Sequence, residues 1–356
     1  MHKTIILTGG GTAGHVNPNL ALLPSLRADG FSIHYIGSAN SIEAELVRDA
    51  GLPFHEIAVG KLRRSLTASG IVKNVRDQIS FAKGIFDARR LLARLRPSIV
   101  FSKGGYVSVP VVIAARTLGI KSVIHESDIT PGLANRLSFS FTDRVCVSFP
   151  ETLGRVPKHK GILTGTPLRP EILRGDKPTG LSICGFTPDR PVLLIVGGSS
   201  GSRVINDTVT SALPQLLKQY QVIHLTGKGN ATRPMPGYAP FEYLKADMPH
   251  ALAAADIVIS RAGANALQEF LALSKPSLLI PLEKASRGDQ VHNAESFARR
   301  GYATVLHEAM LTPEALAYEA HNLYAQRHVL AERMSQAPQS NACEEVMKVI
   351  ASVEAV

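Results

Sequence analysis

The sequence has few cysteines, and no two of them lie close together. Cys146, Cys184 and Cys343 are the only three among 356 residues, and no CxxC pair occurs. Metal sites and redox motifs built from neighbouring cysteines are therefore disfavoured. We expect three buried thiols in a protein of a reducing cytoplasm.

Long hydrophobic runs are also lacking. The longest apolar stretches, such as residues 107–115, stop well short of the ~20 residues that a membrane-spanning helix needs. The chain opens directly on the apolar run 4–8, without the charged and apolar regions of a signal peptide. With 45% hydrophobic and 19% charged residues, the composition is typical of a soluble globular protein.

The common cofactor and metal motifs are missing too. Residues 9–15 read GGGTAGH, which is neither GxGxxG nor the Gly-Lys-Ser/Thr ending of a P-loop. His125, Glu126 and Asp128 cluster after one strand candidate, but neighbouring side chains there alternate in direction and no DxD or HxxxH spacing supports them. We therefore expect no metal, no dinucleotide and no other cofactor.

What the chain does contain is a repeated alternation of short apolar runs with longer helical patterns. Near-continuous Val/Ile/Leu runs predict parallel strands that are buried on both faces by helices. Two such series predict an α/β protein of two doubly wound, Rossmann-like domains. The strand candidates are Thr4–Thr8, Ser32–Ile36, Ile99–Ser102, Ser122–His125, Val192–Val196, Val222–Leu225, Ile257–Ser260 and Ser277–Ile280, with helices expected at Asn19–Ala28 and Glu43–Ala50.

The domain boundary is predicted near residues 163–170 (LTGTPLRP), where glycine and two prolines interrupt regular structure. We assign residues 1–163 to the first domain and 164–339 to the second. Ligands of open parallel sheets bind at the carboxyl ends of the strands. The loops that follow the strands are therefore where a functional site is expected.

Three glycine-rich turns follow strand candidates. Residues 9–15 (GGGTAGH) end on His15, which can act as a general base just past the turn. Residues 197–202 (GGSSGS) add hydroxyls, and residues 103–106 read KGGY. Glycine turns let backbone N–H groups approach an anion, and the helix N-terminus that follows adds partial positive charge. Each turn could also be a tight turn and nothing more, but two of them, each after the first strand of a domain, favour phosphate binding.

Two further segments of the second half are polar. In residues 260–269 (SRAGANALQE), small residues lead from a strand into a helix, whose free N–H groups can receive a diphosphate. Glu269 then lies where a carboxylate could accept both ribose hydroxyls; a solvated helix glutamate is the alternative. Residues 286–294 (SRGDQVHNA) form a loop that could contact a sugar.

The positive charge is concentrated in one part of the chain. Residues 1–165 hold 21 Lys+Arg and 11 Asp+Glu, a net charge of +10, whereas the remainder holds 18 of each. Ten of these basic residues lie between positions 61 and 96, which points to an anionic partner, either acidic lipid or nucleic acid. Interleaved apolar residues favour anionic lipid, and no nucleic-acid motif is present. An amphipathic core helix with a solvated basic face is the alternative; the patch residues are Lys73, Arg76, Ile79, Lys83 and Phe86.

Together, and in order along nearly the whole chain, these motifs resemble the MurG family of bacterial N-acetylglucosaminyltransferases. The resemblance implies a GT-B fold, with two domains facing across a cleft and the C-terminal helix, residues 340–356, packing back on the first. It implies inverting transfer of N-acetylglucosamine from UDP-GlcNAc to an undecaprenyl-linked acceptor, lipid I, to form lipid II for peptidoglycan. It also implies peripheral attachment to the cytoplasmic side of the cell membrane. The matching segments are GGGTAGHVNP, KGGYVSVP, HESD, GTPLR, GGSSGS, RAGA with Glu269, and RGDQ followed by NA.

The resemblance assigns roles to individual residues. It implies His15 as the catalytic base and an acceptor-side loop at Gly104, Gly105 and Tyr106. Glu126 or Asp128 could assist His15 or replace it as the base. For the donor it implies diphosphate contacts from Arg169 and Ser199, a uracil contact from the Leu244 backbone, a ribose contact from Glu269 and a sugar contact from Gln290. The full set for UDP-GlcNAc is Thr12, Ala13, Gly14, Asp128, Arg169, Ser199, Leu244, Gly263, Ala264, Asn265, Ala266, Leu267, Gln268, Glu269 and Gln290.

The sequence departs from the family's usual pattern at a few positions. Ala13 replaces a glycine, Ser127 and Asp128 replace Gln-Asn, and Asp289 replaces a glutamine. Two other enzymes would share much of this pattern. A UDP-GlcNAc 2-epimerase should carry additional carboxylates in the cleft, and another lipid-directed UDP-sugar transferase would share the donor motifs and the basic patch.

Overall fold

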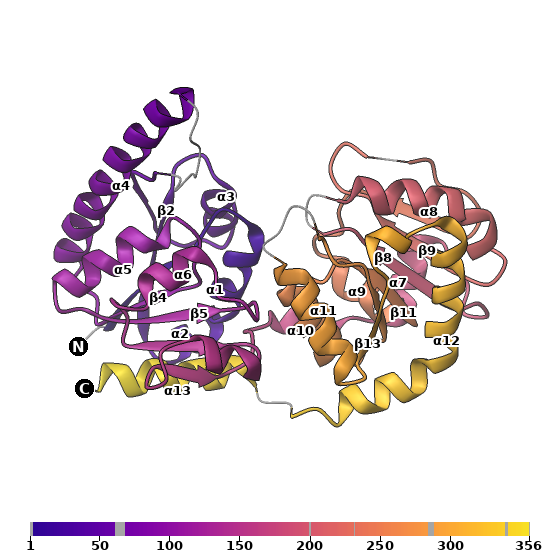
Figure 1. Ribbon diagram of the computed structural model, residues 1–356. Coiled ribbons are helices and arrows are strands. Elements are labelled where there is room, and N and C mark those ends of the chain that lie inside the picture. Colours follow the sequence, from indigo (N-terminus) through magenta and orange to yellow (C-terminus); the bar gives the residue numbers. More distant parts are fainter. Residues whose placement is uncertain are drawn as a thin grey trace. The chain divides into compact units, whose positions relative to one another are not determined.

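The computed structural model describes residues 3–60, 68–198, 201–230, 232–283, 288–338 and 341–355, and gives the course of the chain without its side chains over 68–77. The chain divides into two compact units, Met1–Arg169 with Ser340–Val356, and Pro170–Gln339 (Figure 1). Sequence analysis placed the division after residue 163. The next residues stay with the first unit because Thr164 N donates to Val147 O (3.0 Å) and His125 Nε2 donates to Gly165 O (2.8 Å).

The first unit is a seven-stranded parallel sheet in the order β3-β2-β1-β4-β5-β6-β7. The predicted helix at residues 19–28 is two helices, because Pro24 has no N–H to continue the first. The strands are β1 Lys3–Thr8, β2 Phe31–Ser38, β3 Phe54–Ile57, β4 Ile99–Ser102, β5 Lys121–Glu126, β6 Arg144–Val147 and β7 Gly161–Leu163; the helices are η1 Ala13–His15, α1 Asn17–Ala21, α2 Leu23–Ala28, α3 Ile42–Asp49, α4 Ala68–Leu95, α5 Ser108–Thr117, α6 Leu133–Ser138, η2 Pro150–Arg155 and α13 Ala342–Glu354.

Helices bury both faces of this sheet, as the near-continuous apolar strands require. Ile5 and Leu7 of β1 share a core cluster with five buried residues of α13, whereas Ile6 shares another with Ala88 and Leu92 of α4. Neighbouring strand residues therefore contribute to different clusters. The C-terminal helix α13 is thus part of the core of the first unit.

The second unit is a six-stranded sheet in the order β10-β9-β8-β11-β12-β13, again parallel throughout. The fold class is confirmed. All eight predicted strands are present, and β3, β6, β7, β10 and β13 were missed. The strands are β8 Val192–Val196, β9 Gln221–Leu225, β10 Tyr238–Phe241, β11 Ile257–Ser260, β12 Ser277–Leu279 and β13 Ala303–Val305; the helices are η3 Pro170–Arg174, α7 Lys177–Cys184, α8 Arg203–Leu216, α9 Met248–Ala254, α10 Ala264–Ala272, α11 Asp289–Arg299, η4 Glu308–Met310 and α12 Pro313–Ser335.

The three cysteines are all free, but only Cys146 is buried. Cys184 ends α7 and Cys343 lies in the first turn of α13, and both are partly exposed. The prediction of three buried thiols was therefore wrong for these two. Across the described ranges, no helix combines the length and hydropathy needed to cross a bilayer, and no three His, Cys, Asp or Glu side chains are placed to hold a metal ion.

Candidate functional site

Two glycine turns of the first unit pack backbone against backbone at the carboxyl ends of β1 and β4. Gly10 N donates to Gly104 O over 3.3 Å. A Cβ on Gly105 would lie only 2.2 Å from Gly10 O, and Gly105 has a φ of +86°, which L side chains rarely adopt. Tyr106 lies against the first turn, since a Cβ on Gly11 would be 3.1 Å from its ring. The structure thus brings the predicted acceptor-side residues to the first glycine turn.

A buried carboxylate supports the first turn. Ser41 caps α3 through its hydroxyl, which places Glu43 in the first helical turn. The fully buried Glu43 accepts hydrogen bonds from Gly11 N (3.2 Å) through Oε2 and from Ser38 Oγ (2.5 Å) through Oε1. The N–H groups of Gly10 and Gly11 are therefore both used within the protein, and the binding of an anion by this turn stays a prediction. Sequence analysis missed Glu43 as part of the site.

His15 follows this turn in the form that a base requires. Its Nδ1 lies 3.0 Å from Gly10 O, and a carbonyl oxygen can only accept, so Nδ1 carries the hydrogen. In the neutral ring, Nε2 then holds a free electron pair. Burial and the positive charge of Lys103 lower the pKa of His15 to about 4, against the opposing charge of Asp128. The ring is therefore neutral at neutral pH and able to accept a proton.

The loop after β5 is organised by Glu126. This buried carboxylate accepts from Asp128 N (3.0 Å) through Oε1, and from Gly132 N (2.9 Å) and Asn135 Nδ2 (2.8 Å) through Oε2. Burial and the neighbouring charge of Asp128 raise the pKa of Glu126. Three donors from its own loop and from α6 occupy the carboxylate. These contacts favour a positioning role for Glu126, and its part in proton transfer stays a prediction.

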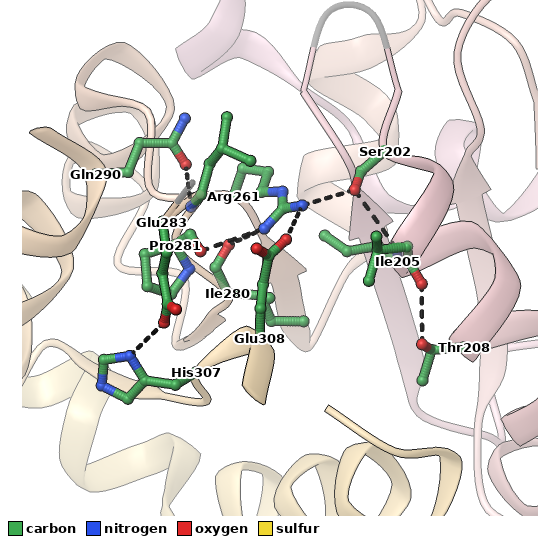
Figure 2. A network of polar contacts seen from close by, with 12 residues as sticks. Ser202, Ile205, Thr208, Arg261, Ile280, Pro281, Glu283, Gln290, His307 and Glu308 are labelled. Carbon is green, nitrogen blue, oxygen red and sulfur yellow. Dashed lines mark hydrogen bonds and ion pairs between the residues drawn. The ribbon is translucent and has the colours of Figure 1, made fainter. Parts of the chain in front are cut away.

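In the second unit, a buried arginine joins the ends of three strands (Figure 2). Arg261, directly after β11, donates through Nη2 to Ser202 Oγ (2.8 Å) and to Glu308 Oε1 (2.6 Å). Its Nη1 donates to the carbonyls of Ile280 (3.0 Å) and Pro281 (3.3 Å), just past β12. Ser202 ends the second glycine turn and caps α8. Sequence analysis quoted Arg261 only as part of a motif and gave it no role.

The second glycine turn is also fixed from the side of β9. A Cβ on Gly201 would lie 2.2 Å from Thr226 O. That carbonyl accepts from Asn206 Nδ2 (2.8 Å), and Asn206 Oδ1 accepts from Nε2 of the buried His224 (3.1 Å). Tyr238 OH lies 2.9 Å from the other ring nitrogen, and burial lowers the pKa of His224 to about 4. A neutral chain of hydrogen bonds therefore supports the turn.

The predicted diphosphate site falls on the start of α10, and its role stays a prediction. Gly263 is its N-cap and offers no capping side chain, while the buried Asn293 holds the preceding Ala262 O at 3.2 Å. Gln290, expected to contact the sugar, accepts from Leu282 N through Oε1 (3.0 Å; Figure 2). Ser199 lies outside the described residues. Ala264 and Leu267 are buried, whereas Asn265, Ala266, Gln268, Glu269, Leu244 and Arg169 are partly exposed, as are Ala13 and Gly14 in the first unit, where Thr12 is exposed.

The predicted membrane patch falls on α4, whose N-terminal end extends beyond α5 in Figure 1. Ile79 and Phe86 are 65% and 66% exposed, and Lys83 between them is exposed. Their spacing places all three on one face of the helix. Ala88 and Leu92 lie in the core, so α4 is both a core helix and the carrier of an exposed apolar and basic face. The side chains of Lys73 and Arg76 lie outside the described residues.

Comparisons with known proteins cover both units. Residues 5–147 match the glycosyltransferase family 28 N-terminal domain, and residues 192–350 match the glycosyltransferase family 28 C-terminal domain. Two similar proteins are UDP-N-acetylglucosamine–N-acetylmuramyl-(pentapeptide) pyrophosphoryl-undecaprenol N-acetylglucosamine transferases. The one from Lachnoclostridium phytofermentans is 50% identical over 99% of both chains, and the one from Clostridium tetani is 46% identical over 98% of both.

Solved structures agree with this similarity. MurG of Acinetobacter baumannii superposes with a TM-score of 0.76 at 27% identity, over 98% of this chain and 99% of that one. A putative UDP-N-acetylglucosamine 2-epimerase from Listeria monocytogenes has a TM-score of 0.72 at 12% identity, over 99% and 96%. The second likeness concerns the fold alone.

Proposed function

The chain belongs to glycosyltransferase family 28, and we propose that His15 and Glu269 carry the acceptor and donor halves of its reaction. The protein transfers N-acetylglucosamine from UDP-GlcNAc to the undecaprenyl-linked N-acetylmuramyl-pentapeptide, forming lipid II for peptidoglycan synthesis. The observation that carries this conclusion is the 50% identity, over 99% of the chain, to the N-acetylglucosamine transferase of Lachnoclostridium phytofermentans. The epimerase alternative has only a shared fold in its support.

In the acceptor half, Nε2 of His15 takes the proton of the attacking hydroxyl. The hydroxyl oxygen forms a bond to the anomeric carbon while the bond from that carbon to the UDP diphosphate breaks. Attack from the face opposite UDP inverts the anomeric configuration. The contact of Nδ1 with Gly10 O supports this role, because it orients the ring and fixes the tautomer.

In the donor half, the second unit supplies positive potential for the leaving diphosphate. The N–H groups at the start of α10 provide it, while Arg261, paired with Glu308, holds the second glycine turn through Ser202. Ser199 and Arg169 add contacts to the diphosphate, Leu244 contacts the uracil through its backbone and Glu269 accepts the ribose hydroxyls.

Glu269→Ala and His15→Ala, assayed side by side with labelled UDP-GlcNAc and a lipid I analogue, test the two roles. His15→Ala should lower kcat by about 10²–10⁴-fold with little change in donor KM. Glu269→Ala should raise donor KM by about 10–100-fold, since a charged hydrogen-bond pair contributes about 1.5–3 kcal/mol. Glu314→Ala, an exposed glutamate of α12, is the control. Unchanged donor KM would make Glu269 a solvated helix residue, and full turnover in His15→Ala would place the base elsewhere.

We also propose that the exposed face of α4 attaches the enzyme to anionic lipid. Ile79 and Phe86 would enter the headgroup region and Lys83 would contact acidic headgroups. The protein should co-sediment with phosphatidylglycerol vesicles but not with phosphatidylcholine vesicles, and salt should weaken the binding. Reversing Lys73, Arg76 and Lys83 to Glu, or changing Ile79 and Phe86 to Ser, should abolish it. Lys218→Glu on the exposed surface of the second unit is the matched control; equal binding by the patch variants would leave α4 as a solvated core helix.

A further inference from the structure

Lys103 is a buried cation that the roles assigned above leave unexplained. It follows β4 and is only 1% exposed, and its Nζ donates to Ser127 Oγ. Burying an ammonium group is costly unless hydrogen bonds and opposite charges compensate it. The compensating charges are Glu126 and Asp128, on and after β5. The buried ammonium of Lys103 is therefore stabilised by residues of the candidate site.

The side chain spans two parts of the site. At its base, Lys103 Cβ would lie 3.1 Å from a Cβ placed on Gly9, in the first glycine turn. At its tip it contacts Ser127, in the loop that Glu126 organises. The groups that face it come from every neighbouring element: Glu126, Asp128 and Cys146 act on its charge, and its charge acts on His15 and His125.

We propose that Lys103 is a positioning residue for sugar transfer: its ammonium ties the Ser127–Asp128 loop to the glycine turns and supplies the buried positive charge that faces His15. The inference rests on the proposed role of His15 as the base. It adds that a second residue, Lys103, acts together with burial to lower the pKa of His15.

The charges of the two groups define a pH window. Burial and the charge of Lys103 lower the pKa of His15 to about 4, so His15 is protonated and inactive as a base only below that value. Burial lowers the pKa of Lys103 itself to about 8, while Glu126 and Asp128 oppose this shift. Above about pH 8 the lysine loses its proton, and with it the charge that holds the loop. Transfer should therefore decline on the alkaline side because of Lys103.

Lys103→Met, which keeps the length and removes the charge, tests the inference. The readouts are the pH profile of kcat/KM for transfer and the titration of the His15 ring by NMR, assigned with His15→Gln. The activity of the wild type should fall above the pKa of Lys103 until it reaches the level of the uncharged Met variant. The Met variant should lack this alkaline limb, and its His15 should titrate at higher pH. Lys103→Arg, charged at every pH, should lack the limb but retain more activity than the Met variant.

If Lys103 has only a structural role, the expected result is different. In that case Lys103→Met lowers activity by one factor at all pH values and leaves the His15 midpoint unchanged, which overturns the inference. If turnover survives in His15→Ala, the base assignment fails separately, and the His15 midpoint still reports on the charge of Lys103.

Ser127→Ala provides a milder variant if Lys103→Met does not fold. It removes the contact of the lysine with the loop and should lower kcat/KM about tenfold at neutral pH. Thr130→Ala is the matched control, because this hydroxyl of the same loop accepts from Arg155 (2.8 Å). Equal activity of the two variants would overturn the loop-fixing role.

Discussion

In the first unit a buried carboxylate supports the glycine turn after the first strand, whereas in the second unit a buried guanidinium supports the corresponding turn. Glu43 accepts the N–H of Gly11, and Arg261 donates to Ser202. The two turns have similar sequences and the same position in their sheets. The groups that bond the two turns directly therefore carry opposite charges, although Glu308 pairs with Arg261 and Lys103 lies beside the first turn.

The difference teaches that a glycine turn at this position does not by itself identify a phosphate site. An anion at the first turn would face Glu43 and would find the N–H groups of Gly10 and Gly11 already bonded. The first turn instead orients His15 through Gly10 O. At the second turn, Arg261 is paired with Glu308, and the start of α8 adds partial positive charge. The first turn thus orients a histidine ring, whereas the second is held by a guanidinium.

The largest expected effect comes from removing the guanidinium. Arg261→Met leaves the largely buried Glu308 without its cation and removes one of the two donors to Ser202 Oγ, so the free energy of unfolding should fall by about 3–5 kcal/mol. Arg203→Met is the control, because the Arg203 side chain is 93% exposed in its ion pair with Asp207. This substitution should change the free energy of unfolding by less than about 0.5 kcal/mol. Urea unfolding measures both, and equal losses would remove Arg261 as the support of the second turn.

Acid should weaken the second unit through His224. Its folded pKa of about 4 lies below the ordinary histidine value of 6.5, so the unfolded chain binds more protons between these pH values and stability is lost as pH falls through that range. The difference of 2.5 pH units corresponds to about 3 kcal/mol, at about 1.4 kcal/mol per unit. In urea unfolding followed by a probe in the second unit, His224→Gln should lose most of this contribution between pH 7 and 4.5, and the exposed His328→Gln should retain it. His15 and His125, whose pKa values burial also lowers, act in the first unit. An unchanged slope in His224→Gln would contradict the neutral chain described for this turn.

The fold could be predicted where strands are central and buried. Val192–Val196 reads as an uninterrupted apolar run because helices cover both faces of β8. The edge strands β3 (FHEI) and β10 (YAPF) carry polar residues or proline and pair on one side only, so their signal is weak. β6, with its run RVCV, is an interior strand and was simply missed.

The candidate site was predictable where it is contiguous in sequence. His15 lies within the motif that it completes, and the residues of the second turn adjoin each other. The supports could not be predicted, because Glu43 is 32 positions from Gly11 and Arg261 is 59 positions from Ser202. Nothing in the local spacing links such pairs, and only the parallel sheet brings them together.

Alanine substitutions at glycines test how closely the backbone packs at each of the two turns. Gly201 and Gly229 have nearly equal φ values, +75° and +76°, but a Cβ meets a carbonyl oxygen at 2.2 Å only at Gly201. Gly105 and Gly119 form a similar pair in the first unit. Alanine at the control positions should cost about 1–2 kcal/mol for the left-handed backbone, and alanine at the turns about 1–3 kcal/mol more. Thermal unfolding that shows no excess loss at Gly105 and Gly201 would contradict the close backbone packing.

The smallest expected effect concerns the carboxylate under the first turn. In Glu43→Gln, one amide oxygen can still accept from Gly11 N or Ser38 Oγ, but the NH₂ group then meets the other donor. One charged hydrogen bond is replaced by a poorer contact, so the free energy of unfolding should fall by about 1–2 kcal/mol. Glu45→Gln, on the exposed side of the same helix, should have almost no effect.

The same variant also tests the electrostatic comparison. If the charge of Glu43 is what makes the first turn unsuited to an anion, Glu43→Gln should bind inorganic pyrophosphate at the first unit more tightly than the wild type does. A chemical-shift titration that follows Gly10, Gly11 and Gly105 would detect this binding. Because the Gly10 N–H stays bonded to Gly104 O in the variant, the gain should be small, within about tenfold. No gain at all would mean that the occupied N–H groups, and not the carboxylate charge, separate the first turn from the second.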